Sequence, residues 1–312
     1  MPTPSADNQA ANESVRYRIE HRTAYRYSES VAICQNQLRM QPRTRPSITC
    51  HFSNVTITPH PERVAEHEDY FGNRVYSFAI ERMHRELTAT VISEVTVEPA
   101  KCLHVSSSPD WQSIQSESRD IVGASGRMIH EFRFDSPRVV SGKMFADYAL
   151  VSFADSRPIV DAALDLTRRI HQDFRYDTAA THVHTETEEA FQLRAGVCQD
   201  FAHIQIACLR SIGLPARYVS GYLRTRPAEG QTRLVGADES HAWLSVYGGQ
   251  KLGWIDCDPT NACFCSTDHI PICIGRDYGD VSPMRGVIIG GGDTSLKVNV
   301  DVTPVEGQGA LT

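Results

Sequence analysis

Hydrophobic and polar residues alternate along the first third of the chain, which is the pattern of half-buried β-strands. In "SVRYRIEHRTAYRYSE" the alternation runs through Tyr17, Ile19 and His21. Three further runs follow, "SITCHFSNVTITP", "NRVYSFAIER" and "RELTATVISEVTVEP", separated by Pro, Gly, Asn and charge clusters that are typical of turns. The pattern predicts an N-terminal antiparallel β-sandwich over 15–105, after a disordered lead-in over 1–14.

The middle of the chain changes to apolar residues at helical spacing. In "RPIVDAALDLTRRIHQDFRYD", Ile159, Leu166 and Ile170 recur on one face of a helix, and Pro158 suits its first turn. The stretch before this region, 106–141, mixes Ser, Pro and Gly. It is predicted to be a connector with some helix.

A second helix is predicted from about Cys198 to Ile212. Apolar residues cover most of its circumference, which is typical of a helix buried at the centre of a domain. Gly213 and Pro215 follow it, as a C-terminal glycine and a trailing proline do at helix ends.

Alternating strands return after this helix. They are "ARYVSGYLRT", "SHAWLSVYG" and "LGWIDCDP", with a last strand in the tail, "TSLKVNVDVTPV". One central helix packed on an antiparallel sheet makes an α+β core. This core is predicted to span 142–312, with the C-terminal strands included.

Charge and cysteine content narrow the function classes. The 312-residue chain has a formal net charge of −7 and a pI near 6.0, whereas nucleic-acid-binding proteins usually carry a basic face. No apolar run is long enough to span a membrane, and the N-terminus lacks the basic and apolar regions of a secretory signal. The odd number of cysteines, nine, favours free thiols in a reducing cytoplasm. We expect a cytoplasmic protein with no nucleic-acid and no membrane partner, and the oligomeric state stays open.

Three residues have the types and the order that thiol catalysis requires. Cys198 heads the central helix, whose N-terminal N–H groups and partial positive charge favour a thiolate and can face an oxyanion. His241 opens the strand "HAWLSVY" and supplies an imidazole that takes a proton and returns it to a leaving group. Asp258 ends "GWIDCDPTN" and supplies a carboxylate that fixes the imidazole tautomer.

Residue types alone leave simpler interpretations open for all three. Cys198 is equally well explained as a buried core thiol, because free cysteine is often buried. His241 fits an inward-facing strand residue, and Asp258 fits the start of a turn before Pro259.

Around these residues the chain resembles the transglutaminase-like superfamily of papain-type thiol enzymes. The blocks "GVCQDFAH", "GLPARYVSGY", "SHAWLSVY" and "GWIDCDPTN" match the family's nucleophile, strand, histidine and aspartate blocks in order. The N-terminal β region and "DHIPICIGRDYGDVSPMRGV" are similar to the bacterial branch, whose members are mostly regarded as cysteine proteases. By this pattern Cys198 matches the nucleophile, His241 the base and Asp258 the orienting carboxylate.

The resemblance implies acyl transfer from an amide through a thioester. With water as the acceptor, the protein is a cysteine hydrolase of a peptide or isopeptide-type amide, which is the preferred prediction. An amine acceptor makes it a cross-linking transglutaminase, and a non-catalytic binding module on the same fold is a further alternative. The expected partner is a peptide or protein amide. The sequence has no recognisable calcium loop of the EF-hand kind, so no cofactor is expected.

The rest of the cleft is less defined by the sequence. Gln192 lies six residues before Cys198, the offset of the oxyanion glutamine in papain-like proteases, although a solvated helix position explains it as well. The tryptophan that the family's cross-linking enzymes use has no counterpart, because no tryptophan lies between Trp111 and Trp243. Further candidates for the substrate cleft are Asp200, His203, Tyr222 and Trp243.

One segment gathers metal-ligating residue types without a metal-binding spacing. Its members are Cys257, Cys263, Cys265, His269 and Cys273. Thiolate and imidazole suit zinc, but the segment has no paired C-x2-C knuckle. We therefore predict no metal site.

Overall fold

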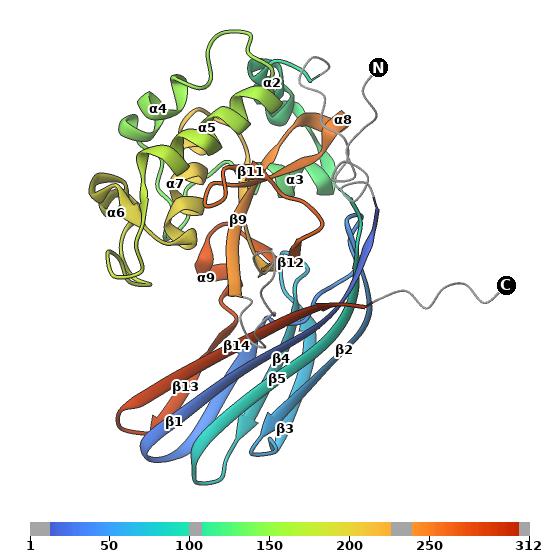
Figure 1. Cartoon of the computed structure of the whole chain (residues 1–312), viewed down its shortest axis with the longest axis vertical. Helices are drawn as coiled ribbons and strands as arrows, with labels where there is room; N and C mark the ends of the chain where they lie inside the picture. Colours follow the sequence, from blue (N-terminus) through green and yellow to red (C-terminus); the bar gives the residue numbers. More distant parts are fainter. Residues whose placement is uncertain (1–12, 100–107, 226–238, 306–312) are drawn as a thin grey trace, which may run out of the picture.

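The protein combines a curled antiparallel sheet with a helix-covered domain (Figure 1). The computed structural model describes residues 13–99, 108–225 and 239–305. Apart from 13–14, the predicted disordered lead-in lies outside the described residues. The α+β fold class is confirmed.

The first sheet takes five strands from the N-terminal region and two from the C-terminal end of the chain. The N-terminal strands are β1 (Val15–Leu38), β2 (Ile48–Thr58), β3 (Arg63–Glu68), β4 (Arg74–Ile80) and β5 (His84–Val97). Their order is β2-β5-β1-β4-β3. The C-terminal strands, β13 (Met284–Gly290) and β14 (Thr294–Pro304), both pair with β1.

Strand β1 bends, and the sheet curls over on itself (Figure 1). The first half of β1 pairs mainly with β5 and β14, and the second half with β4 and β13. The pairing register shifts between Arg26 and Val31. Apolar side chains from both halves enclose a core that includes Tyr27, Val31, Leu38, Phe78, Ile80, Leu87 and Val91. The predicted N-terminal antiparallel β-sandwich is thus formed by one sheet that curls over and is continuous through β1.

Strands β13 and β14 correct the predicted domain boundaries, because they belong to the first sheet and not to the helix-covered domain. Strand β14 pairs with β1 from Tyr17↔Pro304 to Tyr27↔Thr294. Without these partners the long edge of β1 would leave its N–H and C=O groups unpaired. Alternation in the sequence predicted the tail strand correctly but carries no information about which strand lies beside it.

The segment 106–141, predicted as a connector with some helix, belongs largely to the second domain. Its described part forms α2 (Trp111–Asp120) and α3 (Gly123–Glu131). Trp111, Ile114 and Ile129 are buried in the main hydrophobic core. The helices are therefore packed parts of that domain rather than a link between two domains.

The second domain is built on a five-stranded antiparallel sheet in the order β11-β10-β9-β8-β12. Its strands are β8 (Ala216–Leu223), β9 (Glu239–Tyr247), β10 (Trp254–Asp258), β11 (Cys263–Phe264) and β12 (His269–Gly275). Its other elements are α4 (Lys143–Leu150), α5 (Ile159–Asp173), β6 (Arg175–Tyr176), α6 (Thr187–Leu193), β7 (Ala195–Gly196), α7 (Cys198–Ser211), α8 (Gly249–Leu252) and α9 (Tyr278–Val281). Among the described helices, none has the length and apolar character needed to cross a membrane.

Helix α7 is the central helix that the sequence predicted. Every residue from Asp200 to Arg210 is buried. The helix ends at Ser211, and Gly213 follows with a φ of +77°, a conformation that favours glycine. The predicted helix α5 begins at Ile159, with Pro158 at its N-cap, one position before the predicted first turn.

The two sheets share one hydrophobic core, so the first sheet is fixed against the second domain. Tyr17 of β1 and Tyr222 of β8 lie in the same buried cluster. The Nδ1 atom of His21 is 2.7 Å from the hydroxyl of Tyr222. The Asn73 side chain bonds both the N–H and the C=O of Ile274, at 2.9 and 2.8 Å. These contacts join the first sheet to β8 and β12 of the second domain.

Candidate active site

Cys198 is the first residue of α7, where the helix N–H groups have no partner within the helix. Asp200 fixes the turn that leads into the helix. Its Oδ2 accepts hydrogen bonds from Val197 N at 2.8 Å and from Thr181 Oγ1 at 2.6 Å. This carboxylate lies so close to Gly196 that an added Cβ would be 2.5 Å from it. A glycine is therefore required just before the turn that presents the thiol of Cys198.

His241, near the start of β9, lies between the thiol of Cys198 and the carboxylate of Asp258. Its Nε2 donates to Asp258 Oδ2 at 2.8 Å, which leaves Nδ1 available to Cys198. Burial by itself lowers the pKa of His241, but the hydrogen bonds with Asp258 and Cys198 outweigh burial and raise this pKa to about 10. The imidazole is thus held as a cation, which can stabilise a thiolate and protonate a leaving amine.

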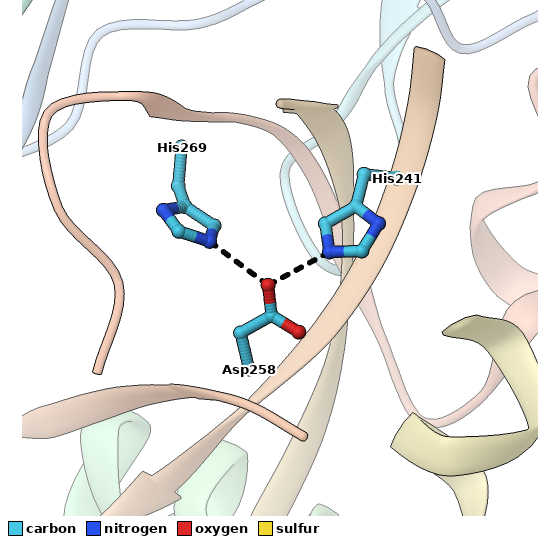
Figure 2. Close-up of side chains that lie close together, drawn as sticks. All are labelled: His241, Asp258 and His269. Carbon is cyan, nitrogen blue, oxygen red and sulfur yellow. Dashed lines mark hydrogen bonds and ion pairs between the residues drawn. The ribbon is translucent and has the colours of Figure 1, made fainter. Parts of the chain in front are cut away.

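Asp258 is fully buried at the end of β10 and accepts hydrogen bonds on both oxygens. Figure 2 shows the two bonds from His241 and His269, which meet on one oxygen. The Oδ2 atom of Asp258 accepts hydrogen bonds from three side chains: His241 Nε2, His269 Nε2 at 3.0 Å and Asn261 Nδ2 at 2.6 Å. Its Oδ1 atom accepts hydrogen bonds from two backbone N–H groups, those of Thr260 at 2.9 Å and Asn261 at 3.2 Å. Burial acts to raise the pKa of Asp258, but these hydrogen bonds hold it well below its ordinary value. The carboxylate is therefore ionised and fixed in orientation.

The neighbouring carboxylate, Asp256, has a different partner. It accepts a hydrogen bond from Ser245 Oγ, which lies directly across from it on β9. Asp258 is the last residue of β10, directly before Pro259, and the end of the strand lets its side chain reach His241.

His269 completes the group, although the sequence analysis assigns it no catalytic role. The backbone N–H of Ser266 donates to its Nδ1 at 3.2 Å, so the ring hydrogen is on Nε2 and is donated to Asp258. His269 begins β12, inside the block from Asp268 that is similar to the bacterial branch. The similarity of this block to the bacterial branch was the one feature of the sequence that could have pointed to a role for His269.

The donor atoms of His241, Asp258 and His269 lie within 4.8 Å of one another. Among the described residues they are the only such group of three or more His, Cys, Asp or Glu side chains. Each of the two histidines turns an Nε2–H, not a lone pair, toward the carboxylate. This arrangement fits a hydrogen-bonded group better than a set of metal ligands. Among the described residues, the cysteines of the segment 257–273 do not join it.

Cys198 and His241 line a cleft of about 650 Å³ between the two domains. The second domain supplies the start of α7, parts of β8 and β9, and α9, with Val197, Cys198, Gln199, Tyr218, Ser220, Ser240, His241, Ala242 and Tyr278. The first sheet and the chain leading into β13 supply the rest, with His21, Thr23, Tyr25, Pro283, Met284, Leu296, Val298 and Val300. Both domains therefore contribute to the space in front of the thiol.

Tyr218 adds a hydroxyl to this cleft that the sequence analysis does not single out. Its ring is buried, with its centre 5.0 Å from that of His203. Burial and, next, the charge of Cys198 raise the pKa of Tyr218 far above its ordinary value. Within the part of the chain that the structure describes, its hydroxyl has no hydrogen-bond partner. The hydroxyl thus keeps its proton and is free to donate it to a ligand beside Cys198.

Gln192, predicted as a candidate oxyanion donor, does not line the cleft. It is exposed on α6, where its Nε2 donates to Glu188 Oε1 at 3.2 Å. Helix α6 ends at Leu193, and Arg194 turns the chain with a left-handed φ of 51° before α7 begins. The papain-like offset fails because the two residues lie on separate helices.

Asp200 and His203 are buried within α7 and do not line the cleft either. Asp200 serves the helix start, as described above. The Nε2 atom of His203 accepts a hydrogen bond from Tyr278 N at 3.1 Å, and burial lowers the pKa of His203 to about 3. Both candidates therefore support the walls of the cleft rather than contact a ligand.

Tyr222 and Trp243 are likewise buried and outside the lining of the cleft. Tyr222 bonds His21 across the domain interface. Trp243 is fully buried, with its ring centre 6.0 Å from that of His241 and 5.4 Å from that of His269. It packs against the two histidines and limits their movement.

Comparisons with known proteins agree with this architecture. Residues 17–96 match the family model of the bacterial transglutaminase-like N-terminal region, and residues 149–259 match that of the transglutaminase-like superfamily. An uncharacterized protein of Mycobacterium tuberculosis is 39% identical over 298 residues, which cover 94% of each chain. A protein-glutamine gamma-glutamyltransferase of Pseudomonas aeruginosa is 34% identical over 111 residues, which are 34% of this chain and 16% of that one.

A solved structure shares the fold over nearly the whole chain. It is named "Putative Cysteine Protease from Cytophaga hutchinsonii" and has a TM-score of 0.73 at 20% identity, covering 95% of this chain and 92% of that one. At this level of identity the likeness shows the fold alone. The family matches cover the curled sheet and the core that holds Cys198, His241 and Asp258. The chain therefore belongs to the transglutaminase-like superfamily and carries the N-terminal region of its bacterial members.

Proposed function

We propose that the protein is a thiol-dependent acyl-transfer enzyme that hydrolyses a peptide or isopeptide-type amide through a thioester. The observation that carries this proposal is the position of His241, which is hydrogen-bonded to Asp258 and lines one cleft together with Cys198. Membership of the transglutaminase-like superfamily supports the same chemistry.

The first half-reaction uses the thiolate of Cys198 and a proton held by His241. The sulfur attacks the carbonyl carbon of the amide, a C–S bond forms and the C–N bond breaks. The electron pair of the C–N bond leaves on nitrogen, which takes the proton from Nδ1 of His241. Asp258 orients the ring and does not take a proton itself. The products are a free amine and a thioester on Cys198.

Water completes the cycle. His241, now neutral, removes a proton from a water molecule while the water oxygen attacks the thioester carbonyl. The C–S bond breaks and its electron pair returns to sulfur. The acid is released, and the thiolate of Cys198 is again paired with the imidazolium of His241.

Two donors are proposed for the negative charge that develops on the carbonyl oxygen. One is the backbone N–H of Cys198 at the start of α7. The other is the hydroxyl of Tyr218, which lines the cleft and interacts with Cys198. A protonated hydroxyl in a buried position stabilises an oxyanion more strongly than one in bulk water.

An amine acceptor is the second candidate. It is favoured by the local likeness to the protein-glutamine gamma-glutamyltransferase of Pseudomonas aeruginosa, over 34% of this chain. The same thioester would then be opened by an amine instead of water. Hydrolysis is preferred because the solved structure that covers 95% of this chain carries the name of a cysteine protease.

The partner and the location are proposals of the same kind. The partner is a peptide or protein that presents an amide to the cleft. A cytoplasmic location is supported by the eight described cysteines, all of which are free.

A library of glutamine-containing peptides, incubated with a tagged primary amine with and without calcium, tests the proposal. Mass spectrometry should show acid products from amide groups and little incorporated amine. The activity should disappear in Cys198→Ala and persist in Cys208→Ala, which removes a buried thiol from the same helix. Strong calcium-dependent incorporation of the amine would establish the cross-linking alternative. Absence of any turnover that depends on Cys198 would favour the non-catalytic binding module.

A further inference from the structure

The first sheet contributes a row of three cross-strand pairs to the catalytic cleft. The pairs, one residue on β1 and one on β14, are His21↔Val300, Thr23↔Val298 and Tyr25↔Leu296. Alternate residues of a strand face the same side, so these side chains share one face of the sheet. All of them line the cleft that also holds Cys198 and His241. We call this row the cleft floor.

The outer part of the cleft floor exposes apolar surface beside the thiol. Leu296 is 56% exposed and Val298 is 46% exposed, whereas Val300 at the inner end is buried in the main core. A cluster of exposed apolar side chains in a concave site is typical of a surface that a ligand covers. Leu296 and Val298 line the same cleft as Cys198. A substrate chain bound at Cys198 is therefore the ligand that would cover them.

Apart from the pair of Cys198 and His241, the described residues that line this cleft carry no charge near neutral pH. Among the described residues that line it there is no Asp, Glu, Lys or Arg, although the whole chain has 31 basic and 38 acidic residues. His21 on the cleft floor is also uncharged near neutral pH, because burial lowers its pKa to about 4. Its ring nitrogens bond the hydroxyls of Tyr222 and Thr23, at 2.7 and 3.1 Å.

A charged substrate side chain would lose water beside the cleft floor without gaining a counter-charge from the described residues of that floor. Such a loss is costly, whereas an apolar side chain gains by covering Leu296 and Val298. Hydroxyl groups on Thr23, Ser220 and Ser240 also line the cleft and can bond the backbone of an extended peptide.

We propose that the cleft floor selects an uncharged peptide segment with apolar side chains beside the scissile amide. This inference rests on the proposed function, because it assigns a substrate class to the same site. It also gives the first sheet a role in specificity, with Leu296 and Val298 as the residues that set it.

Peptides with a central dehydroalanine test the inference, since the thiol of Cys198 adds to the double bond while the flanking residues contact the cleft. Three peptides of equal length carry Leu and Val, Glu, or Lys on both sides of the dehydroalanine. Intact mass and digestion give the rate of Cys198 modification, which is divided by the rate with iodoacetamide. The apolar peptide should react at least about tenfold faster than either charged peptide, as one or two apolar contacts can provide.

A charge placed on the cleft floor should change this preference. Val298→Lys should slow the apolar peptide about tenfold and speed the acidic one, each rate being divided by the iodoacetamide rate of the same variant. Val287→Lys is the matched control, because Val287 is 70% exposed on β13 of the same sheet but does not line this cleft. Equal melting temperatures of the two variants confirm that both are folded.

The outcomes separate this inference from the proposed function. If iodoacetamide modifies Cys198 first but the three peptides react at equal rates, the cleft floor does not select substrates and the inference is overturned. An unchanged preference in Val298→Lys overturns it as well. If Cys198 is not the thiol that iodoacetamide modifies first, the nucleophile assignment fails, and with it the proposed function.

Discussion

His269 donates its Nε2 hydrogen to the same oxygen of Asp258 that accepts from His241, at 3.0 Å compared with 2.8 Å. The other ring nitrogen of His269 is bonded by Ser266 N, whereas that of His241 is available to Cys198. His269 is therefore a positioning residue. It holds the buried carboxylate ionised and in place, and the carboxylate in turn orients His241.

Loss of this second histidine should weaken the site without removing the nucleophile. In His269→Leu, Asp258 loses one charge-assisted hydrogen bond, which corresponds to a roughly ten- to hundredfold loss of amide turnover. The acid limb of the pH–rate profile should also move to higher pH, because the pKa of Asp258 loses one of the interactions that depress it. His269→Gln, which can still donate, should restore part of both properties. A variant that lowers only the melting temperature would mean that His269 is merely structural.

The choice between two nearby carboxylates is a second prediction. Asp258→Asn should lower turnover on the order of 10²–10³-fold, less than the loss in a serine triad, because a thiolate and an imidazolium pair partly without help. Asp256→Asn should keep most of the turnover, since Asp256 bonds Ser245 and not His241. Turnover and melting temperature are measured for both variants. Activity lost in a folded Asp256→Asn and kept in Asp258→Asn would reverse the assignment.

The sequence identified the parts of the site that depend on local structure. Cys198 follows from a helix start after glycine, and Asp258 from a strand end before Pro259, both within the family's blocks. His269 does not follow from such signals. It begins β12, and β9 and β8 lie between β12 and the strand of Asp258, β10, in the sheet. The contact between His269 and Asp258 therefore depends on the path of the loop between β11 and β12 across the end of the sheet.

The same limit applies to the fold. Alternation predicted the strand at 294–304, but the pairing of Val298 with Thr23 joins positions at opposite ends of the chain. The alternation of apolar and polar residues shows which residues of a strand share a face, but it does not show which other strand lies beside it. The cleft floor could therefore not be predicted from the sequence. The same holds for the hydrogen bond between His21 and Tyr222, which joins the first sheet to the second domain.

Cys198 should be the first thiol modified by iodoacetamide at about pH 6, where free cysteine is mostly protonated. Burial raises the pKa of Cys34 to about 11, of Cys263 to about 11 and of Cys273 to about 12, and it also raises the pKa values of Cys50, Cys208, Cys257 and Cys265. Cys198 instead contacts the imidazolium of His241.

Peptide mapping after short exposure to the reagent gives the order of labelling. Cys102 lies outside the described residues, so Cys102→Ser is the background in which the order is measured. Earlier labelling of any other cysteine would contradict the assignment of Cys198 as the nucleophile.

Tyr218→Phe should lower amide turnover by about 10²-fold, which is the usual effect of removing one oxyanion donor. The ring and its packing against His203 are kept, so the melting temperature should change little. The iodoacetamide rate of Cys198 should also stay close to that of the native protein, because alkylation forms no oxyanion. Equal losses of turnover and of alkylation would show that Tyr218 acts on the thiol and not on the carbonyl oxygen.

Amide hydrolysis should be lost as the pH rises through about 10, because the pKa of His241 is raised to about that value. Below it His241 holds the proton that the leaving amine needs, and above it that proton is gone. Alkylation by iodoacetamide needs no proton from His241, so its rate should not fall over the same interval. If the rates of hydrolysis and alkylation fall together, His241 is not the proton donor to the leaving amine.

The stability of the fold should depend on pH in the same direction. A histidine whose pKa is higher in the folded than in the unfolded chain stabilises the fold fully below its unfolded pKa, about 6.5, and this contribution is lost as the pH rises through about 10. The melting temperature of the native protein should exceed that of His241→Gln most at about pH 6 and least at about pH 11. Cys208→Ala, which leaves His241 untouched, controls for the general effect of alkaline pH. A difference between the native protein and His241→Gln that grows with pH would mean that His241 is buried in its neutral form.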